Sequence, residues 1–342
     1  MGLPEIFIEF RTAALSAISR SARGALALVL PGEGEPAVYR SLAAVSESGL
    51  APEDYRILKL AFLAAPSSVT VLRAGEEPAA VFTELERRHF DWLAAPGLDN
   101  DRVISFIKEQ RAGGRGVKAV VANASGPDCE GIVNLWAAGL ELEDGPIGGG
   151  DYTARVAGLL AALPLTRSAT YAALTEVVSC GPVETPNAAV DAGKLIIVPG
   201  RSGYRLGRAV NSLVTLTPDK AAPFQKIKIV EGVDLIRADI SRAFEEGYIG
   251  KVLNDYDNKL LLVTAVNAYL RGLEGDVLDK TADNTCFVSL SGQRDYLEAR
   301  GLSTADMAEG DILRANTGSE VFLEAKLTFC DAMEDLRLRI AM

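Results

Sequence analysis

Residues 25–32 read ALALVLPG, a continuous apolar run that ends at a Pro-Gly pair. A half-exposed strand would alternate apolar and polar side chains, whereas an unbroken apolar run is typical of a strand buried on both faces. Such strands lie in sheets that helices cover on both sides. The run therefore predicts that a hydrophobic core of the α/β class begins here.

The sequence on either side of this run alternates between strand-like and helix-like segments. Further strands are expected at residues 68–72, 117–122, 131–136 and 195–198, and helices at 41–65, 78–93, 100–112, 152–163 and, as a short one, from 187. The acidic, glycine-rich stretch ELEDGPIGGGD at 141–151 predicts an exposed loop. Strands that alternate with helices predict an α/β domain with a largely parallel or mixed sheet, here residues 21–200.

From about residue 205 the pattern changes to a second unit of the α+β class, assigned to residues 201–330. Its opening stretch FQKIKIV, residues 224–230, alternates like a strand, and the apolar residues that follow recur at helical spacing. Further elements are expected as a helix from Tyr256, a strand at 285–290, a helix at 294–301 and a strand at 321–329.

Composition and charge argue against nucleic acids and membranes as direct partners. The 35 basic residues are scattered and the net charge is −11, so direct binding of nucleic acid is not expected. No stretch reaches the roughly 18 uncharged apolar residues of a membrane span, and the N-terminal residues lack a secretory pattern. We therefore expect no direct membrane binding and synthesis in the cytoplasm.

The sequence motifs do not assemble a catalytic or metal site. Residues 199–207, PGRSGYRLG, follow a strand but lack the spacing and lysine of a phosphate-binding loop. Residues 254–258, NDYDN, start like a calcium loop, yet the later glycine and glutamate are missing and helix capping explains them. His89 is the single histidine, on the polar side of a predicted helix, and the four cysteines are far apart. We expect no enzyme activity, catalytic residue, cofactor or metal; the alternative is a soluble cytoplasmic α/β nucleotide-binding protein or enzyme using the 199–207 loop.

Both ends of the sequence alternate like strands. Residues 4–10 read PEIFIEF, and in the last seven residues Leu336, Leu338 and Ile340 alternate with Arg337 and Arg339. A terminal strand can fold back onto its own domain or pair with a sheet in another molecule. In the second case, two arms per subunit that engage different neighbours would build a helix of subunits.

Several segments in order carry a family resemblance. They are YTARVAGLLAALPLTRSATY at 152–171, RAVNSL at 208–213, YIGKV at 248–252 with YDNK at 256–259, and ANTGSEVF at 315–322 through DAMED at 331–335. In this order they resemble the contractile tail sheath proteins of bacteriophages and phage-tail-like bacteriocins, over most of residues 5–342. The sequence departs from that family in lacking a Pro-Gly-Val-Tyr type of opening and room for additional outward domains.

The resemblance implies a sheath subunit that polymerises helically around an inner tail tube and contracts to drive the tube through a target cell envelope. It implies an outer α/β domain at 21–200 and an inner, tube-facing α+β domain at 201–330. It also implies extended β-strand arms at 1–20 and 331–342, which add strands to the C-terminal-domain sheet of a neighbour.

The resemblance further implies which residues and partners are involved. Intersubunit contacts are expected from the N-terminal and C-terminal arms, at Ile6, Phe7, Ile8 and Phe10 and at Leu336, Leu338 and Ile340. The expected partners are other copies of the chain, the tail tube protein, and baseplate and tail terminator proteins. Assembly is expected in the bacterial host cytoplasm, into a virion tail or a phage-tail-like particle.

Overall fold

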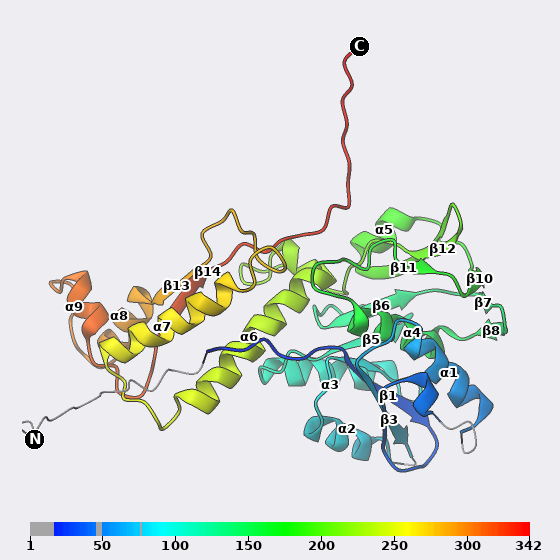
Figure 1. Ribbon diagram of the computed structural model, residues 1–342, viewed down its shortest axis with the longest axis horizontal. Coiled ribbons are helices and arrows are strands. Elements are labelled where there is room, and N and C mark those ends of the chain that lie inside the picture. The colour runs from blue at the N-terminus through cyan, green and yellow to red at the C-terminus, as the bar shows by residue number, and fades with distance from the viewer. Residues whose placement is uncertain (1–16, 46–49, 76) are drawn as a thin grey trace, which may run out of the picture. The chain divides into compact units, whose positions relative to one another are not determined.

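A computed structural model describes residues 17–45, 50–75 and 77–342, which form two compact units (Figure 1). The larger unit contains residues 21–238 and 330–342, and the smaller unit contains residues 239–329 with the described residues before 21. The larger unit extends beyond residue 200 because the following strand still pairs with its sheet and Leu206 and Ala209 lie in its core.

The larger unit is built on a nine-stranded mixed sheet in the order β2-β3-β1-β4-β5-β6-β11-β12-β9. The apolar run forms β1 (Ala25–Pro31, blue in Figure 1), which pairs in parallel with β3 and β4. The remaining strands are β2 (Ala37–Tyr39), β3 (Ser68–Ala74), β4 (Trp92–Ala94), β5 (Lys118–Ala122), β6 (Ile132–Trp136), β9 (Ala173–Leu174), β11 (Lys194–Gly200) and β12 (Gly203–Leu206). Strands β2, β12 and β9 pair antiparallel. The predicted α/β class with a mixed sheet is confirmed.

Strand β1 contributes to a hydrophobic core on each face of the sheet. Leu26, Leu28 and Leu30 belong to one buried cluster, and the alternate residues Ala27 and Val29 belong to another. The first cluster includes residues of α1 (Pro52–Phe62) and α4 (Gly149–Ala162), and the second includes residues of α2 (Pro78–Arg87) and α3 (Asn100–Ala112). Helices therefore cover both faces, as the unbroken apolar run predicts.

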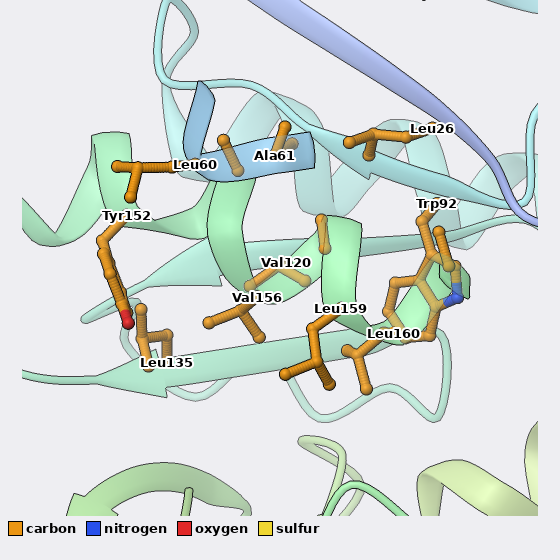
Figure 2. Packing of buried hydrophobic residues seen from close by; sticks show 14 of the residues in the cluster. Leu26, Leu60, Ala61, Trp92, Val120, Leu135, Tyr152, Val156, Leu159 and Leu160 are labelled. Carbon is orange, nitrogen blue, oxygen red and sulfur yellow. The ribbon is translucent and has the colours of Figure 1, made fainter. Parts of the chain in front are cut away.

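Helix α4 packs tightly in the first cluster. Figure 2 shows Tyr152, Val156 and Leu160 of this helix among apolar side chains of the sheet and of α1. At Gly158 a side-chain Cβ would lie 2.1 Å from the carbonyl oxygen of Ala61, so only glycine permits this approach of the two helices. Part of the YTARVAGLLAAL segment thus serves core packing.

The prediction of an exposed loop at 141–151 is correct in the exposure of most of its residues but wrong in the absence of regular structure. This stretch enters a three-stranded antiparallel sheet of β7 (Leu140–Leu142), β8 (Gly145–Ile147) and β10 (Val177–Ser179), and its last residues begin α4. Leu140 and Leu142 are buried, and Gly145 takes the positive φ of 111° that the hairpin turn needs. Glycine and acidic residues here mark a tight hairpin instead of a loop.

The predicted strand at 224–230 is also wrong. A 3-10 turn at Ala222–Gln225 leads into helix α6 (Ile227–Gly247), whose first residues Ile227 and Val230 are buried. A seven-residue pattern of apolar and polar residues fits both the two-residue period of a strand and the 3.6-residue period of a helix. Tertiary contacts then decide which structure forms. The division between the two units falls within α6.

Two predicted helices are shorter than expected. Residues 41–65 contain a 3-10 turn at Leu42–Ala44, and α1 starts only at Pro52, a residue favoured in the first helical turn. Residues 78–93 divide into α2 and strand β4, because Trp92 and Leu93 pair with β1 in the sheet.

The smaller unit combines helices with a two-stranded antiparallel sheet. Its elements besides the end of α6 are α7 (Tyr256–Arg271), β13 (Thr285–Val288), α8 (Leu290–Ala299), α9 (Glu309–Arg314) and β14 (Leu323–Lys326). Helix α7 begins at the residue after Asp255, whose carboxylate accepts a hydrogen bond from the Asn258 amide at 2.8 Å. The 254–258 stretch thus caps a helix that begins at Tyr256, as predicted.

Candidate intersubunit arm and its anchor

The acidic residues 331–335 are attached to the larger unit through the carboxylate of Glu334. This side chain is only 6% exposed, and it accepts hydrogen bonds from Ser168 Oγ at 2.9 Å and Thr170 Oγ1 at 2.6 Å. Its Oε2 atom lies 3.4 Å from Arg208 and 3.6 Å from Lys226. A buried carboxylate is thus held by two hydroxyls and two cations.

The flanking acidic residues use the same two cations. Asp335 accepts hydrogen bonds from Arg208 at 2.7 and 2.9 Å, and Asp331 pairs with Lys226. The hydrogen bond from Arg208 lowers the pKa of Asp335 and in turn raises the pKa of Arg208. We call residues 331–335 with Ser168, Thr170, Arg208 and Lys226 the acidic clip.

The acidic clip joins segments that are far apart in sequence. Ser168 and Thr170 lie in the stretch after α4, Arg208 follows β12, and Lys226 precedes α6. Thr170 Oγ1 also accepts a hydrogen bond from the Ala209 amide at 2.9 Å, which fixes the two loops to each other. Three segments that carry the family resemblance, 152–171, 208–213 and 331–335, therefore meet at one place.

Beyond the acidic clip, residues 336–342 are extended and have no strand partner among the described residues (red end of the chain in Figure 1). The expected contact residues Leu336, Leu338 and Ile340 are 87%, 71% and 77% exposed. They alternate with Arg337 and Arg339, so an extended backbone places the apolar chains on one face and the arginines on the other. The chain displays a strand-like sequence that its own sheets do not use.

The expected N-terminal contact residues Ile6, Phe7, Ile8 and Phe10 lie outside the described residues. The described part of that arm begins at residue 17 and is attached to the smaller unit. The carbonyl oxygen of Ser19 accepts a hydrogen bond from Arg242 at 2.8 Å, and Arg20 pairs with Asp276 at 3.2 Å.

The loop considered for nucleotide binding has a different architecture. Residues 199–207 cover the tight turn of the β11–β12 hairpin, in which Gly200 pairs with Gly203. A phosphate-binding loop instead joins a strand to the N-terminus of a helix, where free amide groups face the phosphate. The geometry at 199–207 therefore gives no support to the nucleotide-binding alternative.

The described residues contain no group of three or more His, Cys, Asp or Glu side chains that could hold a metal ion. His89 is exposed, and the cysteines are free, with Cys129 and Cys286 buried. None of the helices in the described part of the chain has the length and apolar character that a membrane crossing requires.

Comparison with known proteins places the chain in a family. Residues 219–342 match the phage tail sheath C-terminal domain. The tail sheath protein of Clostridium phage phiCD119 is 35% identical over 360 aligned residues, covering 100% of this chain and 99% of the phage protein. The chain belongs to the phage tail sheath protein family. The resemblance found in the sequence is thereby confirmed, and the chain is a tail sheath subunit, a structural component of a phage tail or related particle.

More distant similarities were found both by sequence and by fold. The phage-like element PBSX protein XkdK of Bacillus subtilis is 28% identical over 244 residues, 66% of this sheath protein and 52% of the relative. The contracted helical sheath of the anti-feeding prophage superposes with a TM-score of 0.73 at 15% identity, covering 100% of this chain and 99% of that chain. The sheath tail protein of Desulfitobacterium hafniense superposes with a TM-score of 0.68 at 18% identity, covering 83% of this chain and 93% of that chain.

Proposed function

We propose that this sheath subunit polymerises helically around an inner tail tube, contracts to drive the tube through a cell envelope, and is joined to its neighbours by strand exchange. Its membership of the sheath family and its fold, shared with subunits of a contracted sheath, support the proposal. The observation that carries the strand exchange is the C-terminal segment, whose alternating apolar residues are exposed directly after an anchored clip.

Burial of this segment in a neighbour supplies a driving force of the right size. Covering Leu336, Leu338 and Ile340 contributes roughly 1.5–3 kcal/mol each, and each ladder hydrogen bond adds about 1 kcal/mol. Association and ordering cost about 4–15 kcal/mol. One arm therefore binds weakly, whereas two arms that engage different neighbours act multivalently and hold a lattice together.

The acidic clip reduces the ordering cost of the C-terminal arm. Because Glu334 and Asp335 fix the backbone on the larger unit, only the residues beyond them become ordered on binding. The acceptor is the β13–β14 sheet of a neighbour's smaller unit, which has only two strands in the described part of the chain. A two-stranded sheet of four-residue strands is marginal alone and gains from added strands.

The remaining assignments follow the family. Residues 21–200 form the outer layer of the sheath and residues 201–330 the inner layer that faces the tube protein. Baseplate and tail terminator proteins contact the two ends of the tube of subunits, which assembles in the host cytoplasm. The subunit works as a mechanical component without catalytic residues, cofactor, nucleic acid or membrane contact.

Electron microscopy of three purified proteins tests this proposal. The full-length chain is expected to form helical tubes, while deletion of residues 336–342 or of residues 1–15 is expected to leave folded, unassembled subunits. Circular dichroism and thermal melting establish that the shortened proteins fold. Ordered tubes from either deletion would contradict the assignment of that arm, and ligand-dependent melting of a stable monomer would favour the enzyme alternative.

A further inference from the structure

The smaller unit contains a cavity of about 390 Å³, within the range of roughly 300–1,000 Å³ that is typical of binding pockets. Its walls come from the end of α6, the loop 248–254, the start of α7 and the segment before β14. Ile249 and Leu253 of the loop line the cavity and are 56% and 79% exposed. Large apolar side chains that are exposed beside a cavity favour an interaction surface.

A buried lysine also lines this cavity. Lys259 is 3% exposed, and its ammonium group donates hydrogen bonds to Gln293 Oε1 at 2.7 Å and to Thr317 Oγ1 at 3.0 Å. Both acceptors are uncharged, and an ammonium group has three donors, so one donor remains. Burial lowers the pKa of Lys259, although the charge of Asp255 opposes this shift. An anionic group that enters the cavity offsets the cost of burying the ammonium group.

Two further polar atoms at the cavity have no hydrogen-bond partner among the described residues. They are the hydroxyl group of Tyr248, a residue only 6% exposed, and the Oδ1 atom of Asn254. The Asn254 side chain is fixed, because its Nδ2 atom donates to the carbonyl oxygens of Gly318 and Glu320 at 2.8 and 2.9 Å. Buried polar atoms are nearly always paired in proteins. These unpaired atoms therefore indicate that polar groups of a partner enter the cavity.

A turn between α8 and α9 has the complementary chemistry. The Met307 amide donates to the Thr304 carbonyl at 3.2 Å, which closes a four-residue turn. Asp306 and Met307 are exposed, and the Asp306 carboxylate has no ion-pair or hydrogen-bond partner within the described residues. The unbranched side chain of methionine adapts to irregular apolar surfaces. The turn thus presents an unpaired anion next to a flexible apolar side chain.

The turn does not line the cavity of its own copy. A protruding turn and a cavity at different places on one subunit make a head-to-tail contact, which generates a ring or a helix of copies. We propose that the turn 304–307 of one subunit inserts into the cavity of a second copy, with Asp306 at Lys259 and Met307 against Leu253. This inference rests on the proposed helical polymerisation and adds a contact that the terminal arms do not make.

Disulfide trapping in assembled tubes tests this contact. Cys180 and Cys330, the partly exposed native cysteines, are first replaced by serine. Met307→Cys is then combined with Leu253→Cys, and neither substitution removes a buried residue. Met307→Cys combined with Val38→Cys, at an exposed apolar residue of the larger unit, is the matched control. Mild oxidation and a non-reducing gel report which pair forms a disulfide.

The expected result is a ladder of covalent multimers from the 253–307 pair and no multimers from the control pair. Tubes that give no multimers from the 253–307 pair would overturn this contact and leave the proposed helical assembly intact. Protection of Leu253→Cys from a maleimide reagent in such tubes would assign the cavity to a different segment. If the unsubstituted chain forms no tubes, helical assembly is contradicted and this contact with it.

Charge reversal gives an independent measurement. Asp306→Lys brings a second cation to Lys259, whereas Asp219→Lys makes the same charge change at an exposed site of the larger unit and is the control. Because like charges at an interface are strongly unfavourable, we expect Asp306→Lys to raise the critical concentration for tube formation by about tenfold or more. The two variants should melt alike, and high salt should reduce the difference between their critical concentrations. Equal critical concentrations at low salt would contradict the role of Asp306.

Discussion

Replacing Glu334 by glutamine is expected to release the C-terminal arm without unfolding the subunit. Glutamine keeps the size of the side chain and can still accept a hydrogen bond from Ser168 or Thr170, but it loses both ion pairs. A hydrogen bond to a charged group contributes roughly 1.5–3 kcal/mol, and breaking a fully buried ion pair costs about 3–5 kcal/mol. The side chains of Arg208 and Lys226 are 36% and 27% exposed, which screens the pairs and favours the lower values.

We therefore expect the free energy of closing the acidic clip to become less favourable by about 2–3 kcal/mol, which lowers its equilibrium constant by a factor of roughly 30–150. An arm that must be ordered again before it binds has its affinity reduced by the fraction of closed clips. The critical concentration for assembly should therefore rise, by at most this factor. The melting temperature should change little, because the acidic clip lies at the end of the chain and outside the two buried core clusters.

Two measurements check this expectation. Sedimentation of tubes gives the critical concentration, and hydrogen exchange of peptides from residues 330–342 reports release of the arm. Glu184→Gln makes the same charge change at an exposed site and serves as the control. Thr170→Val, which removes one donor to Glu334, should give a smaller effect of the same sign. If Glu334→Gln leaves both measurements unchanged, the acidic clip does not hold the arm.

Three further outcomes are expected. Gly158→Ala places a Cβ 2.1 Å from the Ala61 carbonyl oxygen, and we expect destabilisation of about 3 kcal/mol or more in thermal melting, with Gly150→Ala in open space as control. The hydrogen bond from Arg208 lowers the pKa of Asp335 in the folded protein. The pair therefore stabilises the acidic clip fully at pH values above the ordinary Asp pKa of about 3.9. This stabilisation is lost as the pH falls through the lowered pKa of the folded protein. Relative to the intrinsic exchange rate at each pH, hydrogen exchange of residues 330–342 should thus rise only below about pH 4. A loss of this relative protection between about pH 5 and 8 would contradict the assignment. Asn267→Leu removes both hydrogen bonds between the Asn267 side chain of α7 and the Cys286 backbone of β13, which should lower the free energy of unfolding by about 2 kcal/mol in melting experiments.

The sequence predicts best those helices and strands whose pattern of apolar residues fits only one type of secondary structure. The apolar run at 25–30 forms the buried strand β1, and the helix expected at 100–112 has these bounds in the structure. Both rest on local periodicity that agrees with the tertiary contacts. Residues 224–230 fail as a strand because their short alternation also fits a helix, and only packing in the larger unit selects α6.

The acidic clip could not be predicted, because its partners are distant in the chain. Glu334 bonds Thr170 across 164 residues, and no periodicity connects the two positions. The signal available in the sequence is the acidic group DAMED, followed at once by Leu336 and the alternating arm. An acidic turn before an exposed apolar strand indicates an anchoring point, yet it leaves the cations unidentified until the fold places Arg208 and Lys226 beside it.

Charged groups of the larger unit lie in two different environments. Arg111 of α3 and Lys118 of β5 contact Asp234 of α6 at 2.8 and 3.3 Å, and all three side chains are nearly fully buried. Removing one member of such a network leaves an unpaired buried charge at a cost of about 3–5 kcal/mol, so the first half of α6 stays fixed to the larger unit. The acidic clip uses partly exposed cations instead, and the arm beyond it carries its apolar residues in solvent. Within the larger unit, the contacts of the acidic clip are therefore more accessible to solvent than those that hold the first half of α6.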